Sequence, residues 1–194
     1  MKRHDEAKDK RKQMFMSLFI VAIMSLSVLG YMIGKDSNDS SKYNGFSFIK
    51  TQKGWKTEAN NKEIFFGYHP SQVSNINISK EIIQKINNSF QIYTTSDENS
   101  LNKQSIALSQ FEFSNIMQDY NKYTVIAFTD QNNFNKPIIT CANATSFVPV
   151  IMFEKYNQTE VTESGNCIYF RSRSDADFIA LKDRVLYGVL GIIN

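Results

Sequence analysis

The fold of this chain is decided by residues 79–128, SKEIIQKINNSFQIYTTSDENSLNKQSIALSQFEFSNIMQDYNKYTVIAF, which alternate between helical and strand patterns. Ser79 can cap a helix, and apolar side chains recur after it on one face, at Ile82, Ile83 and Ile86. A second, longer helix is predicted after Ser100, which can cap it. Its apolar positions are Ile106, Phe113, Ile116, Met117 and Tyr120.

Strands are predicted beside these helices. Residues 90–94 form a short β-rich run, and residues 123–128 form a continuous apolar run that is typical of a strand buried on both faces. Helices between strands favour parallel pairing through right-handed crossovers. The sequence therefore predicts a parallel βαβ core.

The flanking segments predict antiparallel strands and a closing helix. Residues 45–68 alternate apolar and polar positions between turns, as in a meander that ends at Pro70. Short strands are predicted over 138–141, 148–153 and 167–170. Ser174 and Asp177 then open a C-terminal helix with a variant capping box. The expected fold class is α/β, with a mixed sheet and a C-terminal helix after one N-terminal transmembrane helix.

That transmembrane helix is predicted from residues 14–33, which carry no charge and match the length needed to cross a bilayer. A basic run precedes them, and basic residues stay on the cytoplasmic side. The expected organisation is a cytoplasmic basic tail (1–13), a transmembrane anchor (14–34), a linker (35–42) and an extracytoplasmic α/β domain (43–194).

The expected location is therefore the cell membrane, with a single span and a cytoplasmic N-terminus. Cleavage to a secreted domain is the alternative, although the apolar run is longer than a signal peptide needs and lacks a small-x-small site. The tail's six basic and three acidic residues account for the whole net charge of +3, so the rest of the chain is neutral. We expect no nucleic-acid partner for such a domain.

The two cysteines, Cys141 and Cys167, both fall in the exported part. An oxidising compartment favours a disulfide between them. Two free buried thiols, or a catalytic or metal-binding role, are the alternatives. A reactive thiol needs a nearby base, and His69 is the one histidine in this part of the chain.

The sequence nominates no catalytic, cofactor-binding or metal-binding residue. There is no nucleophile elbow, no phosphate-binding loop and no cluster of zinc ligands. Arg171 and Arg173 precede the C-terminal helix and are candidates for anion binding, because a helix N-terminus attracts negative charge. A plain charged turn is the alternative. Among five Asn-x-Ser/Thr sequons, Asn143 and Asn157 are candidate glycosylation sites.

The order of features resembles a set of uncharacterised single-pass, membrane-anchored proteins of small-genome archaea. The elements that carry the resemblance are a basic tail and anchor, and the segments 43–48, 54–55, 68–70, 139–145, 148–150, 165–167 and 183–192. The resemblance implies a cysteine bridge and a closing helix as fixed parts of the architecture. It implies no activity.

These observations predict a membrane-anchored extracytoplasmic domain with an interaction or structural role and a protein partner in the cell envelope. The rival hypothesis is a hydrolase-like envelope enzyme that uses scattered carboxylates with His69 or Arg171. A polar pocket would favour the enzyme and an exposed apolar patch the partner, and we expect such a patch over residues 185–193.

Overall fold

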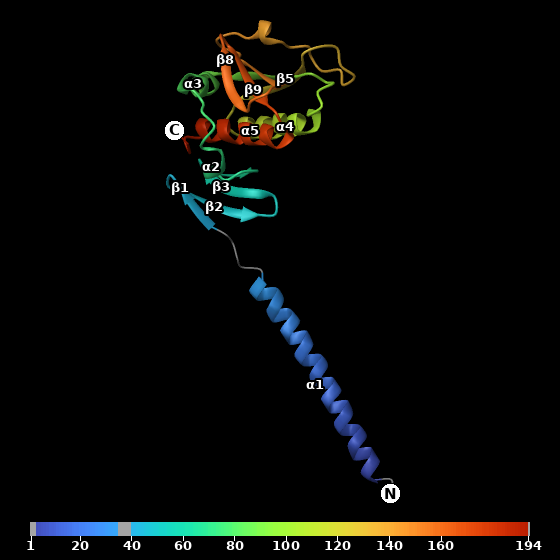
Figure 1. Cartoon of the computed structure of the whole chain (residues 1–194). Coiled ribbons are helices and arrows are strands. Elements are labelled where there is room, and N and C mark those ends of the chain that lie inside the picture. The colour runs from blue at the N-terminus through green and yellow to red at the C-terminus, as the bar shows by residue number, and fades with distance from the viewer. Residues whose placement is uncertain (1–2, 35–39, 194) are drawn as a thin grey trace. The chain divides into compact units, whose positions relative to one another are not determined.

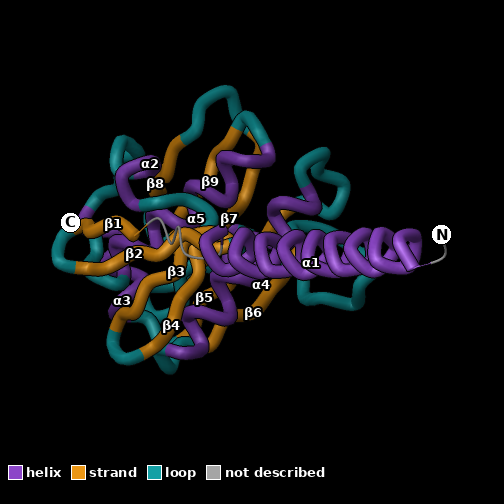
Figure 2. Tube along the Cα trace, turned by 90° about the horizontal axis from the view of Figure 1, so that it is seen from below, coloured by secondary structure: helices purple, strands orange, loops and turns teal. Residues whose placement is uncertain are grey.

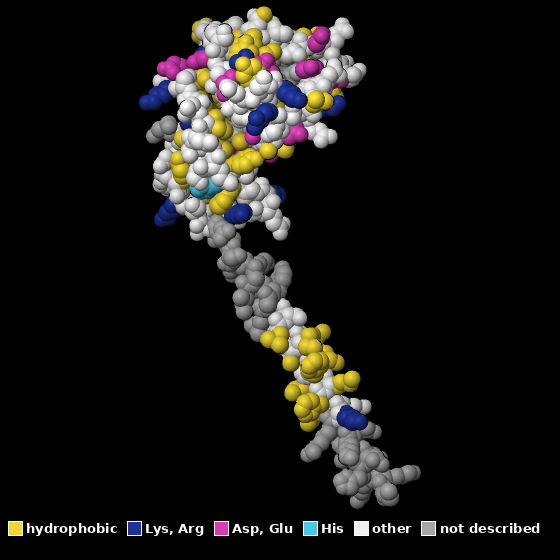
Figure 3. Space-filling model, in the orientation of Figure 1, with side chains coloured by type: hydrophobic (Ala, Val, Ile, Leu, Met, Phe, Trp, Pro, Cys, Tyr) yellow, Lys and Arg dark blue, Asp and Glu magenta, His cyan; other side chains and the backbone are white. Residues whose placement is uncertain are grey.

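The computed structural model describes residues 3–34 and 40–193, and the chain divides into two compact units, residues 1–39 and 40–194. The first unit holds α1 (Arg3–Gly34), whose side chains are described for residues 12–28. Large apolar side chains are exposed along this part of α1 (Figure 3). Among the described residues, no helix combines the length and apolarity needed to cross a membrane. The transmembrane helix expected over 14–34 therefore has no support from them.

The second unit begins with a four-stranded antiparallel meander (Figure 1 and Figure 2). Its strands are β1 (Ser40–Tyr43), β2 (Phe46–Thr51), β3 (Gly54–Ala59) and β4 (Lys62–Phe66). Asn60 and Asn61 both adopt positive φ, as a tight hairpin turn requires. The predicted meander is confirmed. β1 starts inside the range 35–42 expected as a linker, and residues 35–39 lie outside the described residues.

A five-stranded mixed sheet forms the other layer, in the order β6-β5-β7-β9-β8. Its strands are β5 (Gln91–Ser96), β6 (Tyr123–Phe128), β7 (Val150–Lys155), β8 (Glu160–Ser164) and β9 (Cys167–Ser172). All neighbours are parallel except β8, which pairs antiparallel with β9. The predicted α/β class with a mixed, partly parallel sheet is confirmed.

Two strand predictions are wrong in detail. β6 is an edge strand, so residues 123–128 are mostly half-buried rather than buried on both faces. The strand expected over 138–141 is a single bridge between Ile138 and Phe128, followed by the 3-10 helix η1 (Cys141–Asn143). Apolar residues that contact only the rim of a sheet give the same sequence signal as a short strand.

The helices of this unit are α2 (Pro70–Val73), α3 (Lys80–Asn88), α4 (Lys103–Asp119) and α5 (Asp175–Val189). Ser79 caps α3 as predicted, since its hydroxyl accepts a hydrogen bond from the Ile82 N–H at 3.2 Å. The cap position of α4 is Asn102 rather than Ser100. Ser174 occupies the cap position of α5, but its side chain makes no capping hydrogen bond, so the capping box predicted there is absent.

α4 and α5 cover one face of the five-stranded sheet, and the meander packs on α5 from the other side (Figure 1). The Phe178 ring lies 6.1 Å from Phe153 of β7, and the Tyr187 ring lies 4.2 Å from Phe66 of β4. Because α5 lies between two layers, it is buried on nearly every side. The apolar patch expected over 185–193 is therefore wrong: most of this segment belongs to the core.

The buried part of α5 includes an ionic cluster. Lys182 and Asp183 are both fully buried, with the Lys182 Nζ 2.7 Å from the Asp183 Oδ1, and Lys182 also pairs with Glu112 of α4. The Asp183 Oδ2 accepts a hydrogen bond from the Tyr68 N–H at 2.8 Å. Burial raises the pKa of Asp183, and the Lys182 ammonium opposes that rise. This cluster ties α5 to α4 and to the segment that follows the meander.

The opposite face of the sheet is partly covered by the loop 129–149. The disulfide between Cys141 and Cys167 joins this loop to the first residue of β9, with the two Cα atoms 5.3 Å apart. The Thr95 hydroxyl of β5 also donates to the Ile139 carbonyl at 2.7 Å. The predicted disulfide is confirmed, and it fastens a long connection that has no strand or α-helix of its own.

Candidate functional site

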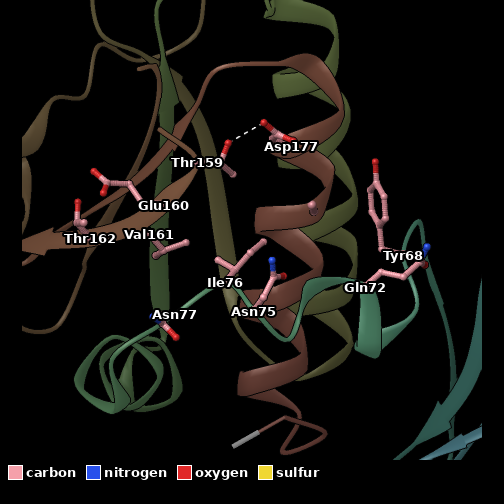
Figure 4. Close-up of a pocket in the computed structure, with 11 residues that line it drawn as sticks. Tyr68, Gln72, Asn75, Ile76, Asn77, Thr159, Glu160, Val161, Thr162 and Asp177 are labelled. Carbon is pink, nitrogen blue, oxygen red and sulfur yellow. Dashed lines mark hydrogen bonds between the residues drawn. The ribbon is translucent and has the colours of Figure 1, made fainter. Parts of the chain in front are cut away.

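A cleft of about 610 Å³ lies beside the edge strand β8 (Figure 4). One wall is β8 and the turn before it. The other consists of Tyr68, α2, the segment 75–77 after α2, and the start of α5. The lining residues are Tyr68, Gln72, Asn75, Ile76, Asn77, Thr159, Glu160, Val161, Thr162, Asp177 and Ala180.

The wall around α2 is built by short-range hydrogen bonds. The Gln72 Oε1 accepts from the His69 N–H at 2.8 Å, which leaves the amide nitrogen of Gln72 for other partners. After α2 the chain makes a turn over residues 74–76 and continues to Ser79, and the Arg184 Nε of α5 donates to the Ile76 carbonyl at 3.0 Å. This bond holds the segment in place, and Asn75 and Asn77 remain exposed on either side of Ile76.

The opposite wall is the free edge of the five-stranded sheet. β8 pairs with β9 on one side only, and Gly165, with φ of +60°, forms the turn between them. No backbone hydrogen bond outside the β8–β9 ladder is recorded for residues 160–164 in the described structure. Alternate N–H and C=O groups of an antiparallel edge strand point away from its partner. The cleft therefore lies along a row of available backbone donors and acceptors.

The carboxylates of the cleft already have partners. The Asp177 Oδ2 accepts from the Thr159 hydroxyl at 2.6 Å and from the Ser172 hydroxyl at 3.4 Å. Glu160 pairs with Arg171 at 3.5 Å. The groups that remain for a ligand are carboxamides, the Thr162 O–H and the β8 backbone, which suit hydrogen bonding to a neutral polar chain.

The two arginines predicted as an anion site have different surroundings. Arg171 projects from β9 onto the outer sheet face, where its guanidinium lies 4.8 Å from the Tyr156 ring and 4.6 Å from the Tyr169 ring. Hydrogen bonds with Glu154, and further contact with Glu160, raise the pKa of Arg171. These two carboxylates offset its charge, whereas Arg173 is exposed. Anion binding stays a prediction, and this pairing weakens it.

The two candidate glycosylation sites are both at the surface. Asn157 is exposed in the turn between β7 and β8. Asn143 is also exposed, but its Oδ1 accepts a hydrogen bond from the Thr140 N–H at 2.9 Å as part of the cap of η1. Modification of either residue stays a prediction.

His69 does not line the cleft. It is 7% exposed, and its ring lies 4.6 Å from Trp55 and 5.1 Å from Phe48, while its Nδ1 lies 2.8 Å from the Ser71 hydroxyl. It caps α2 by accepting from the Ser71 N–H. Desolvation lowers the pKa of His69. These contacts describe a structural residue between the meander and α2.

We expect His69 to make the domain less stable in mild acid. The unfolded histidine binds a proton near pH 6.5, while the folded one resists it, so the free energy of unfolding falls as pH drops below 6.5. The variant His69→Asn keeps a capping side chain without a titrating ring, and its stability should vary less between pH 8 and pH 5.5. Urea denaturation at both pH values measures this. An identical pH dependence in both proteins would exclude His69 as the cause.

This cleft was not predicted from the sequence. Gln72, Asn75 and Asn77 look like ordinary loop residues, and β8 was not predicted, because Glu160–Ser164 has one fully apolar residue, Val161. The one available signal was Gly165-Asn166 before a β-rich run, since such a turn normally joins two strands. It implies a strand on its N-terminal side.

Comparisons with known proteins provide no evidence on function, so a functional proposal has to rest on this geometry. No family model, no curated protein and no solved structure matches the chain. The resemblance to archaeal single-pass proteins gains no support from them.

Proposed function

We propose that this chain is a membrane-anchored, extracytoplasmic binding domain that holds an extended segment of a protein partner along β8. The observation that carries the proposal is the position of the cleft beside the free edge of a five-stranded sheet. A peptide that joins such an edge gains backbone hydrogen bonds from the strand and specificity from the flanking side chains.

The dimensions and chemistry of the cleft support a peptide. β8 has five residues, which span roughly 17 Å at about 3.3 Å per residue. A guest strand would leave its own second edge facing Gln72, Asn75 and Asn77, whose carboxamides can both donate and accept hydrogen bonds. Because the cleft's carboxylates are engaged within the domain, the proposal favours a segment with little net charge.

The anchored, exported location is proposed from the sequence. Residues 14–33 are uncharged, and the basic residues of the tail precede them. The disulfide is consistent with an oxidising compartment. An anchor would keep the cleft near the membrane, where partners in the cell envelope are concentrated.

Site-specific photocrosslinking in intact cells tests the proposal. A benzophenone amino acid is placed at Asn75 or Thr162, which line the cleft, and at Glu58, which is exposed on β3. We expect a discrete protein adduct from both cleft positions and none from Glu58.

A matched pair of variants separates the cleft from the general surface. Asn77→Trp fills the cleft, whereas Asn87→Trp adds the same ring at an exposed position of α3, and each change removes one sequon. The adduct should disappear in Asn77→Trp and persist in Asn87→Trp. The role of β8 would be refuted if Glu58 gave the same crosslink yield as the cleft positions. It would also be refuted if the adduct persisted in Asn77→Trp.

A further inference from the structure

A second cavity, of about 390 Å³, lies at the carboxyl ends of β5 and β6. The first turns of α4 and the loop after β6 complete it. Ligands of open α/β sheets bind beyond the carboxyl ends of the strands, and cavities of this volume accommodate small molecules. The lining residues are Ser96, Glu98, Lys103, Gln104, Ala107, Gln110, Ile126, Phe128, Phe134 and Lys136.

The apolar wall of this cavity is held in place before any ligand arrives. The rings of Phe128 and Phe134 stack with their centroids 5.5 Å apart. The Asn132 Oδ1 accepts from the N–H groups of Phe134, at 3.1 Å, and Lys136, at 3.0 Å. The loop is therefore ordered by its own hydrogen bonds, and Ile126, Phe128 and Phe134 are the large apolar residues of the lining.

A buried polar residue belongs to the same lining. Gln110 of α4 is 2% exposed and lines the cavity, yet within the described structure its Nε2 has no hydrogen-bond partner. A buried N–H without an acceptor is costly, and native proteins rarely keep one. An oxygen acceptor on a bound ligand would satisfy it.

The charges at the mouth indicate the sign of that ligand. Lys103 and Lys136 are exposed there. Glu98 is the one acid in the lining, and both its oxygens accept hydrogen bonds from Asn133, at 2.8 and 3.0 Å. The mouth therefore carries one more positive than negative charge, because its two lysines outnumber its one glutamate.

We propose that this cavity binds a small apolar carboxylate, with its apolar body against Phe128 and Phe134 and its oxygens toward Gln110 and the two lysines. This site is separate from the cleft beside β8 and does not depend on the function proposed for that cleft.

Three probes with one body and different head groups test the charge: 3-phenylpropionate, 3-phenyl-1-propanol and 3-phenylpropylamine. Binding to the full-length chain is measured by titration calorimetry. The carboxylate should bind at least about tenfold more tightly than the alcohol, since a hydrogen bond to a charged group outweighs a neutral one. The amine should bind most weakly, and added salt should reduce the preference for the carboxylate.

Variants assign the contacts. Gln110→Leu keeps the volume and removes the donor, so affinity for the carboxylate should fall about tenfold or more, while the unliganded protein should unfold at the same or a higher denaturant concentration. Phe134→Ala and Lys136→Gln should weaken binding severalfold. The matched controls Phe111→Ala and Lys155→Gln change exposed residues outside the cavity and should leave affinity unchanged.

Three results would overturn the proposal. One is the absence of saturable binding of the carboxylate; another is equal affinity for the carboxylate and the alcohol. The third is a Gln110→Leu variant that binds normally but is less stable without ligand, because Gln110 would then have a structural role.

Discussion

Asp183→Ala is expected to lower the free energy of unfolding by about 3–5 kcal/mol, the usual cost of removing one member of a buried ion pair. Asp183 and its partner Lys182 are both fully buried in α5. Without the carboxylate, Lys182 keeps only Glu112, which is partly exposed, and the Tyr68 N–H loses its acceptor. Both losses leave buried polar groups uncompensated, and urea denaturation of the purified protein measures the effect.

Two control variants identify the origin of this loss. Glu112→Gln changes the partner that is 38% exposed in its side chain, so a loss near 1 kcal/mol or less is expected. The double variant Lys182→Met with Asp183→Leu removes both charges and should recover much of the stability, since apolar pairs often replace buried ion pairs without loss. A loss below about 1 kcal/mol in Asp183→Ala would show that this pair does not hold α5 in place.

The double variant Cys141→Ser with Cys167→Ser is expected to lower the free energy of unfolding by about 3.5 kcal/mol. This value follows from closing a loop of 26 residues in the chain-entropy description of disulfides. The bond also fastens the loop 129–149 to β9, whereas the backbone hydrogen bonds of Thr129, Pro137 and Ile139 hold the first part of this loop to β5 and β6. Loss of the disulfide should therefore loosen this loop as well as destabilise the whole domain.

Hydrogen exchange distinguishes the local effect from a general loss of stability. Amides of the loop 129–149 should exchange faster in the double serine variant under native conditions, while those of β5 and α5 should follow the global free energy of unfolding. Wild-type protein treated with a reductant provides the control with unchanged side chains. Unchanged stability and unchanged loop exchange would mean that the bond is dispensable to this fold.

The regular elements were predictable where periodicity was strong. Residues 80–88 and 123–128 became α3 and β6, because isoleucines recur at helical spacing in the first segment and β-branched and aromatic residues form a continuous run in the second. The turns of the meander were equally clear, because Asn60 and Asn61 accept positive φ better than most residues. Local chemistry decides such segments, so the sequence alone suffices.

The parts that depend on tertiary neighbours were not predictable. α5 looks amphipathic in sequence, yet it is buried on nearly all sides because the meander folds back over it, and charged Lys182 and Asp183 become core residues. Neither cavity is visible in the sequence, since each joins residues from distant segments, such as Asn75 with Thr162 and Gln110 with Phe134.

The measurement that tests the central claim most directly is thiol labelling of Cys141 and Cys167 in intact cells with a membrane-impermeant maleimide. If the domain is exported and its disulfide is formed, neither cysteine is labelled before reduction. Both cysteines are labelled once the exported domain has been denatured and reduced with a reductant that does not cross the membrane. Cysteines that stay unlabelled until the cells are lysed, and then react without reduction, would contradict the account, because the domain would be reduced and inside the cell.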